Sequence, residues 1–186
     1  MRWDDIVSRT ISFLCSISMI GKWLGSNNLQ FAYFMGSHAI KGQLTIFQVL
    51  MVRLESDLAQ VLLAACRGEL TGVTLNWSPG SAMVVVMASK GYPGSYEKGT
   101  MIRNLEEAEQ VAPSVKIFHA GTALDSDGNF IATGGRVLGV TAKGKDLEEA
   151  RDRAYQAVEE INWPGGFYRR DIGWRALPQK QFASQG

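Results

Sequence analysis

The sequence lacks several features that would assign it quickly to a class of protein. Its two histidines, His38 and His119, are too few for a zinc site built on several imidazole rings. Its two cysteines, Cys15 and Cys66, lie far apart and form no Cys-x-x-Cys pair, which indicates a reducing compartment and no disulfide framework. A formal net charge of +1 argues against binding of nucleic acid or membrane surfaces driven by charge.

Long hydrophobic runs are also missing. The one candidate targeting core, ISFLCSISMI at residues 11–20, is about half of the roughly 20 residues that a membrane span needs. Basic residues precede it, as in a signal peptide, but Asp4 and Asp5 lie there too and no clean cleavage site follows. We therefore expect a soluble, intracellular protein without a membrane span, with a weak export or organelle signal as the alternative.

Residues 1–47 differ in character from the rest of the chain. They carry few charges and show no sustained period of either helix or strand. From Gln48 onward, charges, turns and apolar faces fall into recognisable elements, so we place a boundary near residue 47. The sequence leaves open whether the segment before that boundary folds.

Two helices are predicted by their end signals. The first has Ser56 as its N-cap and Gly68 as its C-cap, with Leu58, Val61, Leu62 and Ala65 along one face. The second begins at Asp146, which forms a capping box with Glu149. Its buried stripe comprises Ala150, Ala154, Ala157, Val158 and Ile161, and Asn162-Trp163-Pro164 ends it. A shorter helix capped by Asn104 is also expected.

Apolar and β-branched runs predict strands at residues 81–89, 115–122 and 136–142, with one more in residues 167–177. Asp127-Gly128-Asn129 predicts a hairpin turn between two strands. The order of these elements favours an α+β domain with an antiparallel sheet and packed helices.

Gly134-Gly135-Arg136 stands inside what otherwise reads as a strand pair. Glycines weaken a sheet unless the backbone bends there or something approaches it closely. A bulge followed by an exposed arginine is one interpretation; the other is an anion site in which Arg136 holds a phosphate or carboxylate. His119 and the loop at residues 91–99 are structural in the simplest interpretation. No P-loop, Gly-x-Ser-x-Gly, His-Glu-x-x-His or EF-hand motif is present.

Five segments, in this order and at these spacings, carry a family resemblance: MASKGYPGSYEKG, FHAGT, TGGRVLGVTAKG, EARDRAY and PGGFYRRDIGWRAL. Together they resemble the C-terminal domain of phosphoribosylamine–glycine ligase. QVLMVRLESDLAQVLLAAC is similar to the end of the same family's ATP-grasp domain. The resemblance implies that residues 48–70 end an ATP-grasp domain and that residues 71–186 form the ligase C-terminal domain.

The family's activity, as the resemblance implies, joins glycine to 5-phosphoribosylamine with ATP and gives glycinamide ribonucleotide in purine (IMP) biosynthesis. ATP and Mg²⁺ are the implied cofactors. The resemblance also makes Arg136, with Gly134 and Gly135, the expected site for the substrate phosphate. Tyr92, His119, Gly121 and Arg175 are further residues expected to line the site. No catalytic residue and no metal ligand is assigned.

The sequence departs from the family pattern before Gln48. Family members have a Gly-Asp-Pro-Glu turn there, whereas this chain has Gln43-Leu44-Thr45-Ile46-Phe47, none of which offers a carboxylate to Mg²⁺. Residues 1–47 match nothing in the family, so a truncated product is expected. The chain by itself is then expected to be inactive. The alternative is a non-catalytic domain that associates with a full-length ligase through its ATP-grasp-facing surface.

Overall fold

The computed structural model describes residues 44–177; the targeting core at residues 11–20, Cys15 and His38 lie outside the described part. The described residues fall into two compact units, divided between Ser78 and Pro79. Helix α3 (Leu44–Arg53) runs across the position where the sequence suggested a boundary. The domain limits at residues 47 and 70 stay predictions. No helix in the described ranges is long and apolar enough to cross a membrane.

The first unit contains α3, α4 (Leu58–Arg67) and the 3-10 turn η1 (Leu70–Gly72). The predicted N-cap of α4 was wrong by one residue, because the Asp57 carboxylate accepts the hydrogen bonds from Ala59 N and Gln60 N. The Ser56 hydroxyl is used elsewhere, accepting a 2.8 Å hydrogen bond from Asn76 N. Gly68 closes the helix with φ 73°, as predicted.

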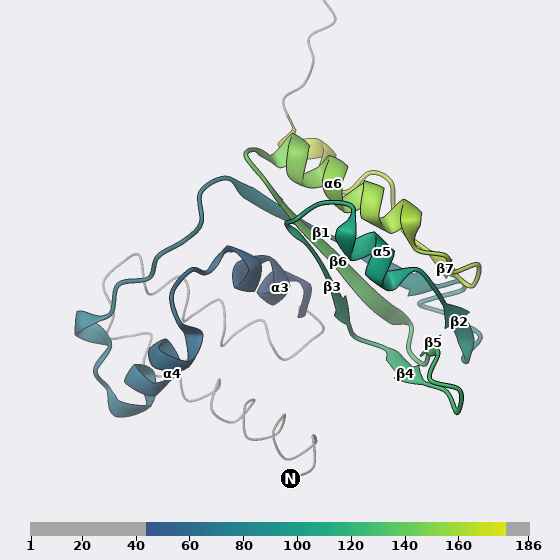
Figure 1. Ribbon diagram of the computed structural model, residues 1–186, viewed down its shortest axis with the longest axis horizontal. Helices are drawn as coiled ribbons and strands as arrows, with labels where there is room; N and C mark the ends of the chain where they lie inside the picture. The colour runs from purple at the N-terminus through teal and green to yellow at the C-terminus, as the bar shows by residue number, and fades with distance from the viewer. Residues whose placement is uncertain (1–43, 178–186) are drawn as a thin grey trace, which may run out of the picture. The chain divides into compact units, whose positions relative to one another are not determined.

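The second unit is built on a four-stranded antiparallel sheet in the order β3-β6-β1-β7. Its strands are β1 (Ser81–Ser89), β3 (Val115–His119), β6 (Arg136–Gly144) and β7 (Gly166–Phe167). The prediction of a buried strand at residues 81–89 is confirmed. So is the predicted fold class, an α+β domain with an antiparallel sheet (Figure 1).

A smaller three-stranded sheet has the order β2-β5-β4. Its strands are β2 (Thr100–Ile102), β4 (Thr122–Leu124) and β5 (Phe130–Ala132), which all lie between β1 and β6 along the chain. The predicted hairpin is confirmed, since β4 and β5 pair antiparallel. The Asp125 carboxylate organises its loop by accepting hydrogen bonds from Asp127 N and Asn129 N. These bonds, chiefly that from the Asn129 backbone, lower the pKa of Asp125 below its ordinary value.

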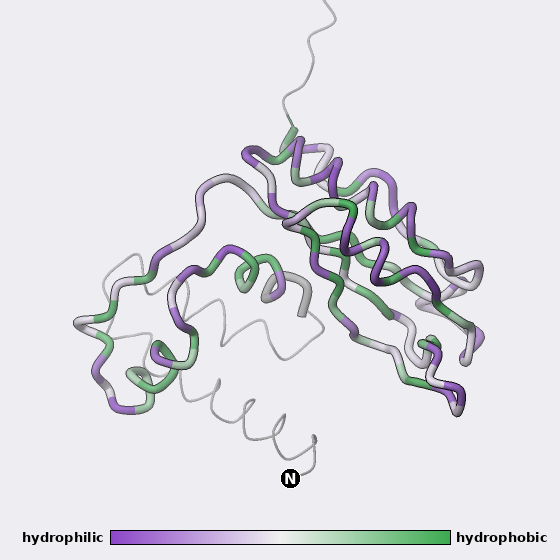
Figure 2. Tube along the Cα trace, in the orientation of Figure 1, coloured by the Kyte–Doolittle hydropathy of each residue, from purple (hydrophilic) through white to green (hydrophobic). Residues whose placement is uncertain are grey.

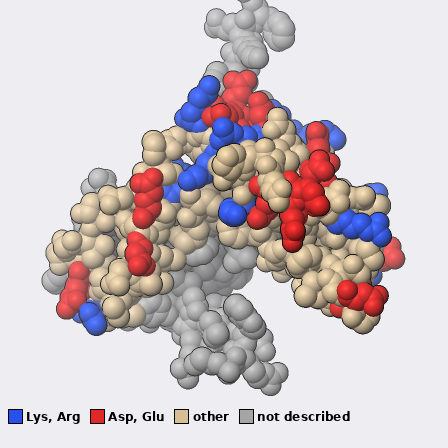
Figure 3. All heavy atoms as spheres, in the orientation of Figure 1, with Lys and Arg blue, Asp and Glu red and all other residues tan. Residues whose placement is uncertain are grey.

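Helices α5 (Leu105–Gln110) and α6 (Leu147–Glu160) cover one face of the larger sheet (Figure 1). The strands of that sheet are largely hydrophobic, whereas α5 and α6 alternate between polar and apolar residues (Figure 2). Acidic side chains gather over α5 (Figure 3), which carries Glu106, Glu107 and Glu109. The predicted stripe of α6 is confirmed as buried; beneath it lie Val85, Met87, Leu138, Val140 and Ala142.

Two expectations about the ends of elements hold only in part. Asn104 is the N-cap residue of α5, but it adopts a left-handed conformation (φ 61°) and its side chain makes no cap hydrogen bond. The segment predicted as a last strand pairs only at β7 and then turns into the 3-10 helix η2 (Trp174–Ala176). The Tyr155 hydroxyl explains the departure, because it donates to Arg169 O and accepts from Ile172 N, backbone groups that a strand would pair in a ladder.

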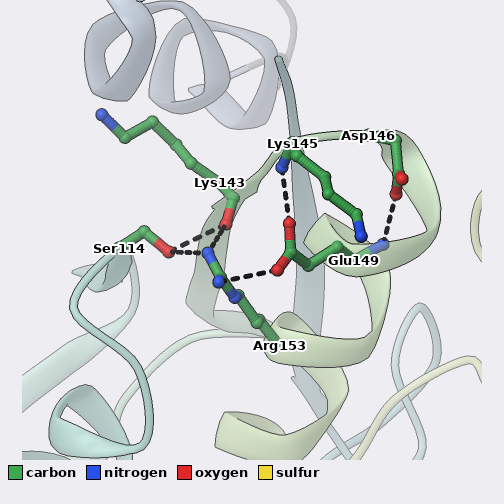
Figure 4. Close-up of polar contacts among 6 residues, drawn as sticks. All are labelled: Ser114, Lys143, Lys145, Asp146, Glu149 and Arg153. Carbon is green, nitrogen blue, oxygen red and sulfur yellow. Dashed lines mark hydrogen bonds and ion pairs between the residues drawn. The ribbon is translucent and has the colours of Figure 1, made fainter. Parts of the chain in front are cut away.

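The first turn of α6 is fixed to the strands by a polar network (Figure 4). Asp146 accepts a hydrogen bond from Glu149 N, and Glu149 accepts one from Lys145 N, which confirms the capping box with a shift of one residue. Arg153 then donates to Glu149 Oε1 at 2.8 Å and to Lys143 O at 2.9 Å. Since Ser114 Oγ also donates to Lys143 O, helix α6, β6 and the turn before β3 are joined at one point.

Removing this junction should destabilise the domain. We expect Arg153→Ala to lower the free energy of unfolding by about 1–2 kcal/mol, because it leaves Glu149 and the Lys143 carbonyl without a charged donor. Lys116→Ala is the matched control: its ion pair with Glu109 is exposed, so a loss of no more than about 0.5 kcal/mol is expected. Urea unfolding followed by circular dichroism measures both; equal losses would contradict the role given to Arg153.

Candidate functional site

The strands β1 and β6 end beside each other in an irregular pair. Met87 lies opposite Leu138, but Ala88 lies opposite Arg136, so Val137 is an extra residue on β6. Such a bulge bends the strand and changes where neighbouring side chains point. The fully buried Val137 uses its carbonyl to accept hydrogen bonds from Ala120 N and Gly121 N. Arg136 is the first residue of β6, and these two hydrogen bonds hold the backbone directly after it.

Ser89, at the end of β1, fixes the approach to Arg136. Its backbone N donates to Gly135 O and its hydroxyl donates to Gly134 O, both at 2.8 Å. The side chain is 1% exposed, so both contacts are sheltered from water. The sequence analysis did not single out Ser89; a serine at the end of a strand gives no signal that its partner lies 45 residues away.

Gly121 and Gly134 bring two backbones into close contact. Gly121 O accepts hydrogen bonds from Thr133 N and Gly134 N. A Cβ on Gly121 would lie 2.6 Å from Arg136 O and 3.0 Å from Gly134 Cα. Only glycine fits at this position, because the atoms that it meets belong to the main chain and cannot move aside.

Gly135 has a different neighbour, the ring of Tyr92. A Cβ on Gly135 would overlap Cδ2 of that ring. Tyr92 also makes an edge contact with Tyr96, with ring centroids 6.2 Å apart. The close approach that the glycine pair predicted is thus made by Tyr92 and Gly121 of the chain itself. A substrate phosphate at Gly134 and Gly135 stays a prediction.

His119 is the last residue of β3, two positions before Gly121. Its Nδ1 lies 2.9 Å from Thr122 Oγ1, in hydrogen-bonding contact, and its ring lies over Phe130 with centroids 4.7 Å apart. These contacts give the histidine a structural position between β3 and the β4–β5 hairpin. Because it pairs with Leu138, two residues from Arg136 along β6, it also lies near the start of that strand.

Arg175 is not brought to this junction. Its guanidinium lies over the Trp174 ring, 5.2 Å from the centroid. Gly173, two residues earlier, packs against Met83. Met83 is six residues before Ser89 on β1, about 20 Å at the usual rise of a strand. Of the predicted site residues, the structure therefore gathers Tyr92, His119, Gly121, Gly134, Gly135 and Arg136, and leaves Arg175 apart.

The gathered residues suit anion binding better than metal binding. Among residues 44–177, no group of three or more His, Cys, Asp or Glu side chains is placed to hold a metal ion. These residues therefore do not fit a magnesium site. Arg136 supplies a planar fork of donors that matches phosphate or carboxylate geometry.

The second unit is thus an α+β domain whose antiparallel sheet presents an arginine at a glycine-lined junction. A family model described as phosphoribosylglycinamide synthetase, C domain, matches residues 82–175. The chain belongs to this family, which confirms the resemblance seen in the sequence.

Several named relatives are similar over most of the chain. Phosphoribosylamine–glycine ligase from Arabidopsis thaliana, named as chloroplastic, is 79% identical over 138 residues, 74% of this chain and 26% of that protein. The ligase from Vigna unguiculata is 85% identical over 64% of this chain and 39% of its own length. A crystal structure of the ligase from Thermotoga maritima matches 61% of this chain and 26% of its own, with 36% identity and a TM-score of 0.49. The chain thus spans well under half the length of these relatives.

The packing at Gly135 predicts a specific sensitivity. Gly135→Ala should lower the free energy of unfolding by about 1–3 kcal/mol, because the new methyl group overlaps the Tyr92 ring. Gly72→Ala is the control, since a Cβ there meets nothing within 4 Å. Adding Tyr92→Ala to Gly135→Ala should make the two losses non-additive in a double-mutant cycle. Additive losses would show that the ring and the glycine do not act together.

Proposed function

We propose that this chain supplies the substrate-phosphate side of a phosphoribosylamine–glycine ligase. In the proposed reaction, the glycine carboxylate takes the terminal phosphoryl group of ATP and ADP leaves. The amine of 5-phosphoribosylamine then attacks the acyl phosphate, phosphate leaves, and glycinamide ribonucleotide forms. The 79% and 85% identity to ligases named for this activity supports the assignment.

Arg136 is the residue on which the assignment of a site depends. It starts β6 opposite Ala88, and the two carbonyls before it are held by Ser89. A guanidinium on such a fixed backbone loses less conformational freedom on binding than one on a mobile loop. Gly134 and Gly135 allow the tight course of the chain that places it there. Tyr92, His119 and Gly121 are proposed to line the same site.

ATP, glycine and Mg²⁺ are proposed as substrates and cofactor of the complete ligase. Neither the glycine-binding residues nor the groups that hold Mg·ATP are assigned to residues 44–177. For the compartment, we propose the plastid or the cytoplasm; the Arabidopsis relative is named as chloroplastic.

A second proposal concerns the face of the larger sheet that α5 and α6 do not cover. That face carries Val84, Val86 and Phe118. Successive side chains of a strand point to opposite faces, and each of the three is next to a core residue in its strand. All three are apolar, half-buried and outside the core cluster. We propose that this face associates with the ATP-grasp part of a ligase.

Light scattering of the chain mixed with a full-length ligase tests this association. A complex with the summed mass is expected, and two unchanged separate masses would contradict the proposal.

The phosphate assignment predicts a selective kinetic defect. In an intact ligase of the family, replacing the arginine equivalent to Arg136 with alanine should raise KM for the sugar phosphate about ten- to a hundredfold, the usual worth of a charged hydrogen bond. KM for ATP should stay nearly unchanged.

Binding to the chain itself provides a test without turnover. Isothermal titration with glycinamide ribonucleotide should give heat for the natural chain and for Arg67→Ala, an exposed arginine at the end of α4. Arg136→Ala should abolish that heat. Equal increases of KM for ATP and for the sugar phosphate, or unchanged titration of Arg136→Ala, would remove Arg136 from this role.

A further inference from the structure

A hollow of about 520 Å³ opens between three segments of the second unit. Lys90 follows β1; Glu97, Thr100, Met101 and Arg103 come from β2 and its flanks; Pro164 and Gly165 precede β7. Its size lies within the usual range of small-molecule sites, about 300–1,000 Å³. Neither the predicted site residues nor the ligase proposal uses this hollow.

The walls of the hollow are tied together by hydrogen bonds. Lys90 N donates to Gly165 O at 2.9 Å, which joins the end of β1 to the segment before β7. The indole Nε1 of Trp163 donates to Thr100 Oγ1 at 2.9 Å. Arg103 and Asn162 exchange two backbone hydrogen bonds, at 3.0 and 3.1 Å. The hollow is therefore formed before any ligand arrives, which lowers the entropic cost of binding.

Gly165 keeps part of the wall open. A Cβ there would lie 2.9 Å from Thr100 Cβ and Oγ1. The Thr100 hydroxyl already accepts the hydrogen bond from Trp163, so it cannot turn away without losing that bond. Any larger residue at position 165 would push β2 away from the segment before β7.

The lining has an excess of positive charge. Lys90 and Arg103 are cationic and Glu97 is anionic, and none of the three forms an ion pair with another residue in the described ranges. The Nε of Arg103 donates to Met101 Sδ at 3.1 Å. The N–H groups of its two terminal nitrogens therefore remain available to a ligand. Two cations with uncommitted donors at one concave site are the usual recognition elements for a phosphate or carboxylate group.

We propose that this hollow is a second anion site, for a small organic anion that carries a phosphate or carboxylate group. Lys90 and Arg103 bind the anionic group. Glu97 accepts a hydrogen bond from a hydroxyl or amino group on the same ligand, and Met101 and Pro164 contact its carbon skeleton. The lining of this site does not include Arg136, Gly134 or Gly135. The proposal does not depend on the ligase proposal.

The test is a titration of the full chain with inorganic phosphate and, separately, with succinate. We expect at least one of the two anions to bind, which also tells phosphate recognition from carboxylate recognition. Arg103→Gln and Lys90→Gln should each weaken that binding about tenfold or more, since each removes one charged donor. Lys145→Gln, an exposed lysine at the start of α6, removes the same charge elsewhere and should leave the affinity unchanged.

Two further variants separate this site from its neighbours. Glu97→Gln should tighten anion binding about three- to tenfold, because it removes the one negative charge of the lining; a purely structural role for Glu97 would not produce this gain. In an Arg136→Gln background, which removes the other proposed anion site, Arg103→Gln and Lys90→Gln should still weaken the binding that remains. The proposal is overturned if neither anion binds, if Arg103→Gln and Lys90→Gln bind as well as the natural chain, or if Arg136→Gln alone removes binding. Unfolding midpoints within the error of the natural chain confirm that the variants fold.

Discussion

The pairing of β1 with β6 is the interaction on which the rest of the second unit depends. The ladder runs from Ser81 opposite Gly144 to Ala88 opposite Arg136, and both strands place their apolar side chains under the alanine stripe of α6. A slip of one residue would turn every one of these side chains to the other face. The bulge at Val137 interrupts the regular ladder just after the first residue of β6. The register of the core strands therefore also fixes the position of Arg136.

That dependence links packing to the proposed chemistry. Gly121, Gly134 and Gly135 are small because the chain itself fills the space beside them, with the Tyr92 ring on one side and main-chain atoms on the other. The arginine gains a fixed base from this close packing. The hollow at Lys90 and Arg103 uses the same end of β1, because Ser89 binds the glycine pair and Lys90 binds Gly165. One strand end thus positions cationic side chains at two separate sites.

Much of this fold could be predicted from local sequence signals. The strand at residues 81–89, the β4–β5 hairpin, the Gly68 cap and the buried stripe of α6 each follow from patterns within a few residues, and the structure has all four. The errors arise where distant groups compete. Ser56 is not the N-cap of α4, and its hydroxyl binds Asn76 N instead. The last segment leaves the sheet after Phe167, where the Tyr155 hydroxyl binds the backbone at Arg169 and Ile172. Ser89 could not be found from sequence, since its partners are 45 and 46 residues away.

The central claim, that the junction at Gly134 to Arg136 receives the phosphate of a sugar phosphate, is tested most directly by a residue-resolved titration. Backbone amide signals of the ¹⁵N-labelled chain would be followed during addition of ribose 5-phosphate. The account predicts saturable shifts at Gly121, Gly134, Gly135 and Arg136, with one affinity shared by all four. The account would be contradicted if the amide signals of these four residues did not move, even if those of Lys90 and Arg103 did.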